Sequence, residues 1–428
     1  MPLHASQGLL ETALAALVAL VLCRLMIVGL GNLADRRNWV DVPGGRKAHR
    51  HPVPVVGGLA MMLSASLGLV LFDVPDAAER ALLPGLLLVC AVGWRDDRQP
   101  VRASLRLGAH MAAALLAVGA GGTVLHSLGD LFGTGRIELG AWALPVTVFA
   151  IAGIANAFNL IDGLDGLAGG LALIALGWFT AILMFVELQG GAGFHAATLP
   201  IAFAGAVIGF LHFNRRTERL RRAEVFMGSA GSVMLGLLLA WLAVRTTQSF
   251  GDHDAPPVVA LWILAVPLFD TLSCMLRRLQ AGQSPARPDR RHIHHIMLAR
   301  TRDTRRAVES LLLLAFGSGG VGIVGWLVGV PEAVLFWALL GLFAIYHVKA
   351  CAYWNRVDRA DGRVGRTTPH PTGDAAQPAA SASHQGGVSG AGVMSRLSAG
   401  RREAPVRSAV TEAARAEARR AIDDRAPH

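Results

Sequence analysis

Apolar blocks of about 20 residues recur along the chain and constrain its fold more than any other feature. Such a block can cross a bilayer as an α-helix, because a helix satisfies its backbone polar groups internally. Hydrophobic residues make up 53% of the chain and charged residues only 16%, which predicts an all-α, polytopic membrane bundle. About eleven candidate spans can be placed, at residues 9–31, 55–72, 81–94, 105–125, 142–160, 167–186, 197–213, 230–246, 258–276, 308–328 and 333–350.

Alternate connections between these spans are strongly basic. The arginine-rich ones lie at residues 32–54, 95–104, 214–232 and 277–307, and the intervening ones hold few cations. The positive-inside rule then places the basic connections in the cytoplasm, the N-terminus outside and, with an odd number of spans, the C-terminus inside. The net charge of +10 therefore indicates basic cytoplasmic loops rather than a nucleic-acid partner.

The composition changes near residue 354. Residues 354–428 are rich in Pro, Gly, Ala and Ser and carry many arginines. Such a segment cannot bury enough apolar surface to fold alone. We expect residues 1–353 to form one transmembrane domain with functional cytoplasmic loops, and residues 354–428 to form a basic, mostly disordered cytoplasmic tail.

A polar stripe interrupts the apolar runs at residues 153–170. Asn156, Asn159, Asp162 and Asp165 follow one another at steps of three, which on a helix keeps side chains on one slowly drifting face. Such groups at the end of an apolar helix are costly unless they line a wet cavity. Carboxylates suit Mg²⁺, and amides can bind a polar ligand. The alternative is a polar helix end followed by a Gly-rich turn.

The second basic loop, GWRDDRQPVRASLR, places two carboxylates side by side at a membrane end. Asp96 and Asp97 repel each other, which favours a bound divalent cation or a shared proton. A surface charge cluster is the alternative. Arg98, Arg102 and Arg106 follow and would balance the acids or hold phosphate.

The longest loop contains PDRRHIHHIML, in which Arg290 precedes His292, His294 and His295. The HxHH pattern would suit zinc or copper. The four cysteines of the chain show no ligand spacing and read as core residues, so we rank metal binding below phosphate or sugar binding. Many cations at one membrane face suit a di-anionic ligand such as a nucleotide diphosphate.

Two further loops carry weaker signals. The first basic loop offers Lys47 and His49 as cationic donors, although a plain positive-inside loop with a Pro-rich turn explains it equally well. The segment VFMGSAGSVMLG places Ser229 at the expected start of a span. Its simplest interpretation is a helix N-cap, and such a terminus also offers free N–H groups to an anion.

Together these motifs resemble the polyprenyl-phosphate N-acetylhexosamine-1-phosphate transferase family, whose members start lipid-linked O-antigen, teichoic-acid and peptidoglycan precursors. The resemblance covers about residues 40–300 in the family's motif order, and its motifs are RKAHRHPVPVVGGLA, GWRDDR, NAFNLIDGLDGLAGG, PDRRHIHHIML and PLFDTLSCMLRR, the last containing Asp270. The histidine loop and the span count are more similar to the O-antigen and teichoic-acid initiators than to the peptidoglycan enzyme.

The resemblance implies transfer of N-acetylhexosamine 1-phosphate from a UDP-sugar to undecaprenyl phosphate, with release of UMP. It implies a multi-pass protein of the bacterial cytoplasmic (inner) membrane in contact with membrane lipid, and it leaves a homodimer open. Asp96, Asp97, Asp162 and Asp165 would be catalytic and hold Mg²⁺, or Mn²⁺ in its place. The substrate-binding residues would be Asn156, Asn159, Lys47, His49, Arg290, His292, His294 and His295.

One position departs from the family pattern. The family usually has FMGDxGS, whereas this chain has FMGSAGS with Ser229 at the Asp position. A hydroxyl is a much poorer ligand for a hard cation than a carboxylate. Three outcomes follow for the metal site. The remaining aspartates are enough to hold the cation, or Glu224 replaces the missing carboxylate. In the third, the protein is a catalytically weak or inactive member of the family that acts as a membrane partner or scaffold. A membrane transporter is the other alternative.

Overall fold

A computed structural model describes residues 2–37, 39–41, 52–72, 75–119, 121–189, 195–217, 222–284 and 291–360. The chain forms helices α1 (Pro2–Arg37), α2 (Gly57–Phe72), α3 (Ala77–Asp96), α4 (Ala103–Gly119), α5 (Ala143–Ile161), α6 (Leu167–Leu188), α7 (His195–Asn214), α8 (Gly228–Gln248), α9 (Pro257–Ile263), α10 (Ala265–Gln280), α11 (Ile293–Thr301), α12 (Thr304–Leu327) and α13 (Glu332–Ala360). Short 3₁₀ turns occupy Gly140–Trp142 and Gly251–His253, and the one sheet in the described part pairs β1 (Val40–Asp41) with β2 (Val53–Pro54).

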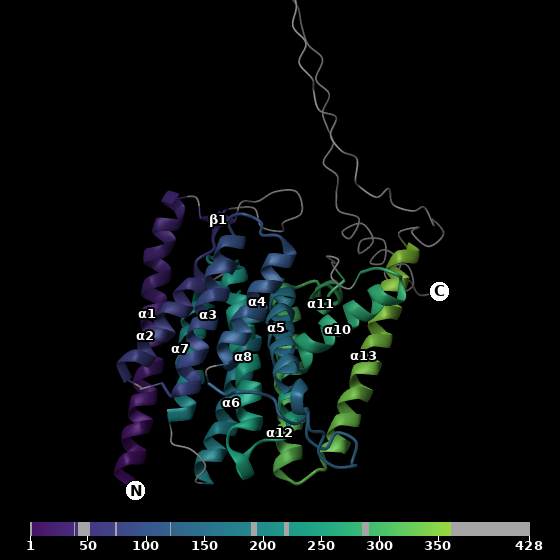
Figure 1. Ribbon diagram of the computed structural model, residues 1–428. Helices are drawn as coiled ribbons and strands as arrows, with labels where there is room; N and C mark the ends of the chain where they lie inside the picture. Colours follow the sequence, from purple (N-terminus) through teal and green to yellow (C-terminus); the bar gives the residue numbers. More distant parts are fainter. Residues whose placement is uncertain are drawn as a thin grey trace, which may run out of the picture. The chain divides into compact units, whose positions relative to one another are not determined.

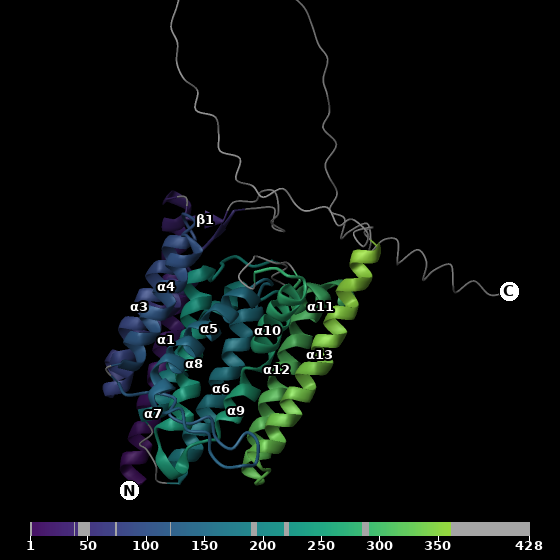
Figure 2. The same ribbon diagram turned by 45° about the vertical axis from the view of Figure 1, so that its right-hand side comes forward.

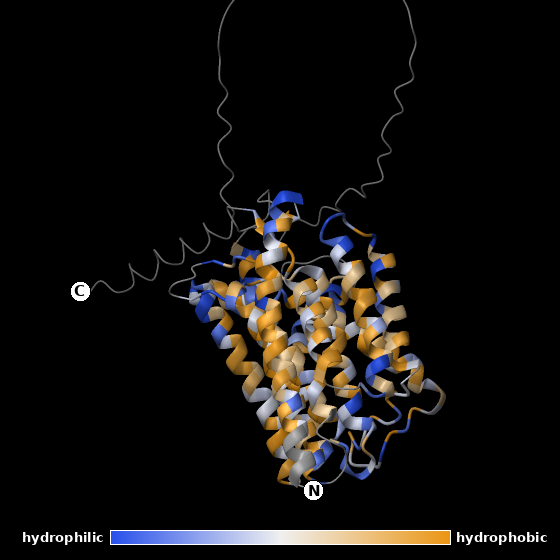
Figure 3. Ribbon diagram, turned by 90° about the vertical axis from the view of Figure 1, so that its left-hand side faces the viewer, coloured by the Kyte–Doolittle hydropathy of each residue, from blue (hydrophilic) through white to orange (hydrophobic). Residues whose placement is uncertain are grey.

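The described helices confirm a polytopic membrane fold of the all-α class (Figure 1). Eight of them are long and apolar enough to cross a membrane, and α2 and α4 are shorter apolar helices. Hydrophobic residues cover the middle of the helices, and hydrophilic residues gather toward their ends (Figure 3). The number of crossings and the orientation in the bilayer stay predictions.

Two predicted spans differ from the helices found. The segment predicted as one span at 258–276 is divided into α9 and α10, which are bent by 82° at the break. The span predicted at 105–125 ends early, because α4 stops at Gly119 and Gly122 adopts a φ of +67°. Glycine is the residue that takes such a backbone conformation without strain. Residues 121–139 then form an irregular connection with one bridge between Ser127 and Glu138.

The start of α3 shows how local sequence sets the position of the acidic loop. Asp76 accepts a hydrogen bond from the Glu79 backbone N–H at 2.8 Å, and the Glu79 carboxylate accepts from the Asp76 N–H at 3.1 Å. This capping box fixes where α3 begins. The helix then continues to Asp96, so Asp96 and Asp97 lie at the end of α3 opposite the capping box.

Helix α8 is the centre of the bundle and is buried along most of its length. Glycines let its neighbours approach closely at the N-terminal end. A Cβ built on Gly58 of α2 would lie 2.3 Å from the Gly231 nitrogen, and one built on Gly93 of α3 would lie 2.5 Å from the Ala230 nitrogen. Further along, a Cβ on Gly236 would lie 2.7 Å from the Ala155 Cα of α5. The segments that carry the sequence motifs therefore converge on the start of α8.

Contacts join the described parts of the predicted cytoplasmic loops within residues 1–351, the unit to which this description of the bundle applies. In Figures 1 and 2, β1 and α11 lie at the end of the bundle opposite the N-terminus. Phe226 bonds back to Pro54, which joins the first basic loop to the segment before α8. Described residues of two basic connections, 32–54 and 214–232, are thus in direct contact.

Candidate active site

The connection between α5 and α6 holds two of the predicted acids. Helix α5 ends at Ile161, and Asp162 adopts φ −73° and ψ 68° while the Gly163 N–H bonds to the Ile161 carbonyl at 2.8 Å. This geometry is an inverse γ-turn. The expectation of one helical stripe is therefore correct for Asn156 and Asn159 and wrong for Asp162 and Asp165, which lie on the connection. The glycines that follow Asp162 favour the turn over further helix.

Asp165 forms an ion pair with a residue of the segment after α7. Its Oδ2 accepts from the Arg216 Nε at 2.6 Å. The neighbouring Gly166 has φ +83° and donates its N–H to the Asn214 Oδ1 at 2.7 Å, and the Asn214 Nδ2 donates to the Val225 carbonyl at 2.8 Å. These bonds hold the acidic connection against the segment that leads into α8.

Asp97 caps the N-terminus of α8 from the neighbouring helix. Its Oδ1 accepts from the Ser229 N–H at 2.8 Å and its Oδ2 from the Ala230 N–H at 3.3 Å. These donors have no partner within their own helix, and the positive end of the helix dipole favours an anion there. Gly228 has φ +67°, and a Cβ on it would lie 2.2 Å from the Asp97 Oδ2. Only glycine fits between the carboxylate and the helix start.

The adjacent Asp96 has different hydrogen-bond partners. Its carboxylate accepts from the Val101 N–H at 2.7 Å and from the Arg106 Nη1 at 2.9 Å. Asp96 and Asp97 therefore have different hydrogen-bond partners. Neither of these two hydrogen bonds of Asp96 connects it to the other acids. Arg106 balances an acid as predicted, whereas the guanidinium of Arg98 lies 3.0 Å from the Trp94 ring centroid. The role of Asp96 in the site stays a prediction.

The charges of Asp97, Asp162 and Asp165 affect one another. Burial, together with the charges of the nearby Asp97 and Asp165, raises the pKa of Asp162 to about 7. Burial likewise raises the pKa of Asp97, while the N–H groups of Ser229 and Ala230 oppose that shift. Crowded, partly desolvated carboxylates of this kind are stabilised by a cation.

The acid cluster fits a magnesium ion by its chemistry. Asp97, Asp162 and Asp165 offer only oxygen ligands, which Mg²⁺ prefers. Among the described residues, the one group with three ligand atoms within 4.8 Å of one another is Asp270, Cys274 and His292, so the three acids do not form a closed cage. An open set suits Mg²⁺, which is usually held by one or two carboxylates together with substrate phosphates.

The predicted amides lie on α5 beside this cluster. Asn159 accepts a hydrogen bond from the Ser232 hydroxyl at 2.9 Å, which ties α5 to the first turn of α8. Asn156 lies one turn earlier and is partly buried. Ser229 is partly buried at the start of α8, beside Asp97, and Glu224 is exposed. Lys47, His49 and Arg290 lie outside the described residues, so their predicted roles stay untested.

The histidine loop meets the acidic connection. His292 precedes α11, and His292 and His294 are buried with parallel rings 5.6 Å apart. A Cβ built on Gly163 would lie 2.3 Å from the His294 Nε2, so this ring packs directly on the residue after Asp162. The His295 ring lies 4.3 Å from that of His294. Burial, with the neighbouring His295 and His292, lowers the pKa of His294 to about 3, so this ring is neutral.

The contact between Gly163 and His294 gives a first prediction. Gly163→Ala places a methyl group where the His294 ring now lies, so we expect the histidine loop to be displaced and activity to fall about 10- to 100-fold. The matched control is Gly153→Ala on α5, where a Cβ would meet nothing within 4 Å. Initial-rate assays of both purified variants check this. Equal activity of the two would show that the contact is dispensable.

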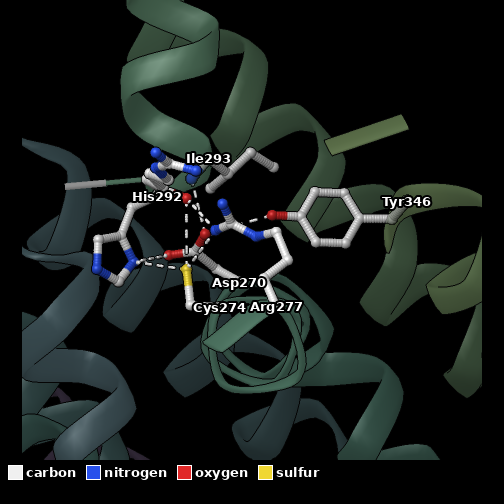
Figure 4. Close-up of polar contacts among 7 residues, drawn as sticks. Asp270, Cys274, Arg277, His292, Ile293 and Tyr346 are labelled. Carbon is white, nitrogen blue, oxygen red and sulfur yellow. Dashed lines mark hydrogen bonds and ion pairs between the residues drawn. The ribbon is translucent and has the colours of Figure 1, made fainter. Parts of the chain in front are cut away.

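Some residues of the site gave no signal that sequence reasoning recognised. Asn214 and Arg216 appeared only as part of a basic loop, yet they anchor the acidic connection. Cys274 is a buried core residue, as the sequence predicts, but no sequence pattern indicated that its Sγ lies 3.6 Å from the His292 Nδ1. Figure 4 shows this neighbourhood, including Tyr346 of α13.

The structure is a membrane helical bundle in which acids, an amide and histidines meet at the ends of α3, α5 and α8. The chain belongs to glycosyl transferase family 4, whose sequence profile matches residues 80–247. The family resemblance inferred from the motifs is thereby confirmed.

Several relatives are undecaprenyl-phosphate alpha-N-acetylglucosaminyl 1-phosphate transferases. That of Escherichia coli O157:H7 is 34% identical over 337 residues, which are 78% of this chain and 89% of the relative. That of Salmonella typhimurium is 34% identical over 83% of this chain and 96% of the relative. That of Haemophilus influenzae is 32% identical over 80% and 94%, respectively.

Proposed function

We propose that this protein transfers an N-acetylhexosamine 1-phosphate, with N-acetylglucosamine as the first candidate, from its UDP-sugar to undecaprenyl phosphate and releases UMP. The observation that carries the proposal is the packing of His294 on Gly163, which joins the histidine loop to the acid cluster. The relatives, which are transferases named for this lipid acceptor and this sugar, support the same reaction.

In the proposed reaction, an oxygen of the lipid phosphate attacks the β-phosphorus of the UDP-sugar. The bond from that phosphorus to the bridging oxygen breaks, and its electron pair leaves with UMP. Phosphoryl transfer depends mainly on positioning and charge neutralisation. Asp97, held rigidly on the start of α8, would orient the acceptor phosphate, and the amides of Asn156 and Asn159 would contact the donor.

In the proposed site, the acids bind the cation and a histidine contacts the phosphates. Asp97, Asp162 and Asp165 would hold Mg²⁺, or Mn²⁺, and a bound dication supplies neutralisation of the diphosphate and stabilisation of the leaving UMP. His292 would place its positive ring against the same phosphates, while the neutral His294 packs on the acidic connection. Lys47, His49, Arg290 and His295 are proposed to contact substrate, and Asp96 is proposed to belong to the acid set.

The membrane arrangement is part of the proposal. We place the site at the cytoplasmic face of the bacterial inner membrane, with the N-terminus outside and about eleven crossings. Asp97 lies in a basic connection, which the positive-inside rule assigns to the cytoplasm, and it bonds to the end of another basic connection at Ser229. UDP-sugars are water-soluble, so this face is where donor and lipid phosphate meet. A homodimer is compatible with the proposal and is not required by it.

The location of the acids favours an enzyme over a transporter. A transporter places charged groups near the bilayer midplane on interrupted helices. Here Asp97 follows the last residue of α3, and Asp162 follows the last residue of α5. The scaffold alternative rests on Ser229 alone, and the retained carboxylates of Asp97, Asp162 and Asp165 argue against that alternative.

The proposal is tested with the full chain purified into lipid nanodiscs. Undecaprenyl phosphate is supplied with UDP-GlcNAc, and UMP release and the lipid-linked product are measured together. We expect both products in equal amounts, loss of both on chelation of divalent cations, and recovery on addition of Mg²⁺. A parallel panel of UDP-sugars identifies the donor. Absence of transfer from every UDP-sugar would overturn the proposal.

Ser229 gives a second prediction. Ser229→Asp adds a carboxylate beside Asp97, and more charged ligands bind a hard cation more tightly. We expect the Mg²⁺ concentration for half-maximal activity to fall about tenfold, which corresponds to about 1.4 kcal/mol. Ser229→Asn, which is isosteric but neutral, should leave that concentration unchanged. A Mg²⁺ titration of both variants is the measurement, and an unchanged value for the Asp variant would place Ser229 outside the metal site.

A further inference from the structure

Asp270 is a fully buried carboxylate on α10 that the proposed reaction leaves without a role. Its Oδ2 accepts from the His292 Nδ1 at 2.8 Å. Its Oδ1 accepts from the Ile293 backbone N–H at 2.7 Å and from the Tyr346 hydroxyl at 3.3 Å. Figure 4 shows these groups converging on one side chain from α10, α13 and the start of α11. A buried carboxylate with this many donors is held in one orientation.

The carboxylate controls both the charge and the direction of the His292 ring. Burial alone would lower the pKa of His292, but the hydrogen bond and charge of Asp270, together with Cys274, raise it to about 10. The ring therefore carries protons on both nitrogens at neutral pH. With Nδ1 bound to Asp270, the Nε2–H lies on the opposite ring edge, which points away from the carboxylate in Figure 4.

A metal ion is the competing interpretation of this cluster. Asp270, Cys274 and His292 supply oxygen, sulfur and nitrogen atoms within 4.8 Å of one another, a donor set that zinc accepts. However, the Nδ1 and Oδ2 atoms are already in direct hydrogen-bond contact, and the Arg277 Nη2 donates to the Cys274 Sγ at 3.0 Å. A guanidinium beside the sulfur supplies the positive charge that a metal would bring, so the contacts favour a hydrogen-bonded pair.

We propose that Asp270 is a positioning residue for the transfer reaction, which holds the Nδ1–H of His292 so that the Nε2–H donates to a diphosphate oxygen of the UDP-sugar. This inference rests on the proposed function. His292 is connected to the acid cluster through the parallel ring of His294, which packs on Gly163. A charge-assisted donor at this place favours the phosphate charge that develops as UMP leaves.

The hydrogen bonds of Asp270 make one substitution unusually informative. In Asp270→Asn, the amide oxygen is required at the Oδ1 position, because the Ile293 N–H and the Tyr346 hydroxyl both donate there. The amide NH₂ then faces the His292 Nδ1, which must become an acceptor. The ring loses its positive charge while the volume of residue 270 barely changes. A related substitution in a catalytic triad acts through the histidine in a similar way.

The kinetic test is a double-mutant cycle with UDP-GlcNAc and undecaprenyl phosphate. His292→Asn keeps a donor toward Asp270 and removes the Nε2–H, and we expect it to lower kcat about 100-fold or more. Asp270→Asn should lower kcat about 10- to 100-fold, with KM for UDP-GlcNAc changed less than about threefold. The double variant should be no slower than His292→Asn, because Asp270 acts only through His292. Additive effects would overturn the proposal.

A second measurement does not depend on activity. Protein labelled with [¹⁵N]histidine is compared by NMR for the unmodified chain and Asp270→Asn, with His292→Asn used to assign the signal. We expect a doubly protonated His292 ring in the unmodified chain and a neutral ring in Asp270→Asn. An unchanged ring state, or zinc bound stoichiometrically to the purified protein, would overturn the inference. If no UDP-sugar is turned over while the ring state changes as expected, the proposed function fails and the positioning contact stands.

Discussion

Asp162→Asn should lower the rate of UMP release by on the order of 10²–10³-fold or more while leaving the protein at least as heat-stable as before. The two effects have one cause. Asp162 is a desolvated carboxylate beside Asp97 and Asp165, and its raised pKa means that its charge is unfavourable in the folded protein without a cation. Asparagine has the same shape without the charge, so it relieves repulsion and removes a cation ligand together.

Asp165→Asn provides the contrast that makes this result interpretable. Asp165 is paired with Arg216 at 2.6 Å, so its replacement should lower both activity and the midpoint of thermal unfolding. Asp252→Asn, at an exposed position beyond the other end of α8, should change neither. The measurements are UMP release at saturating Mg²⁺ and thermal unfolding in the same detergent at pH 8. Loss of stability in Asp162→Asn comparable to that in Asp165→Asn would assign Asp162 a structural role instead.

The fold class, and the placement of several candidate site residues at the ends of apolar helices, could be predicted from the sequence because both depend on local patterns. Long apolar blocks demand helices in a bilayer, and each motif lies next to the end of such a block. Basic residues mark one end of the bundle. The sequence therefore assigns Asp97, Asp162 and the histidine loop to a common face without any knowledge of packing.

The hydrogen-bond partners of the site residues could not be predicted from the sequence, because they lie far away along the chain. Asp97 bonds to a helix start 132 residues away, and Tyr346 reaches Asp270 across 76 residues. Asp96 and Asp97 look equivalent in sequence, yet one faces Arg106 and the other faces α8. Their directions follow from where α3 ends relative to its neighbours, which no spacing rule specifies. The spacing of three residues from Asn156 to Asp165 predicted one helical face. That spacing could not show that α5 ends in a turn at Asp162.

The packing around α8 explains why the site depends on glycines as much as on acids. Gly93 lies one turn before Asp97, and a Cβ on it would lie within 2.7 Å of three backbone atoms, in Ser229 and Ala230. Backbone atoms cannot rotate away as a side chain does, so the two helices must separate. Separation would also stretch the hydrogen bonds from the start of α8 to Asp97.

We therefore expect Gly93→Ala to lower the free energy of unfolding by about 1–3 kcal/mol. We expect activity to fall further than stability does, because Asp97 is displaced with the helix contact. Gly108→Ala, at an exposed position of α4, is the matched control, since a Cβ there meets nothing within 4 Å and alanine favours helix. Thermal unfolding in detergent and UMP release are measured for both variants. Unaltered stability of Gly93→Ala would show that α3 and α8 can separate freely, and unaltered activity would show that Asp97 need not be held on α8 for the reaction.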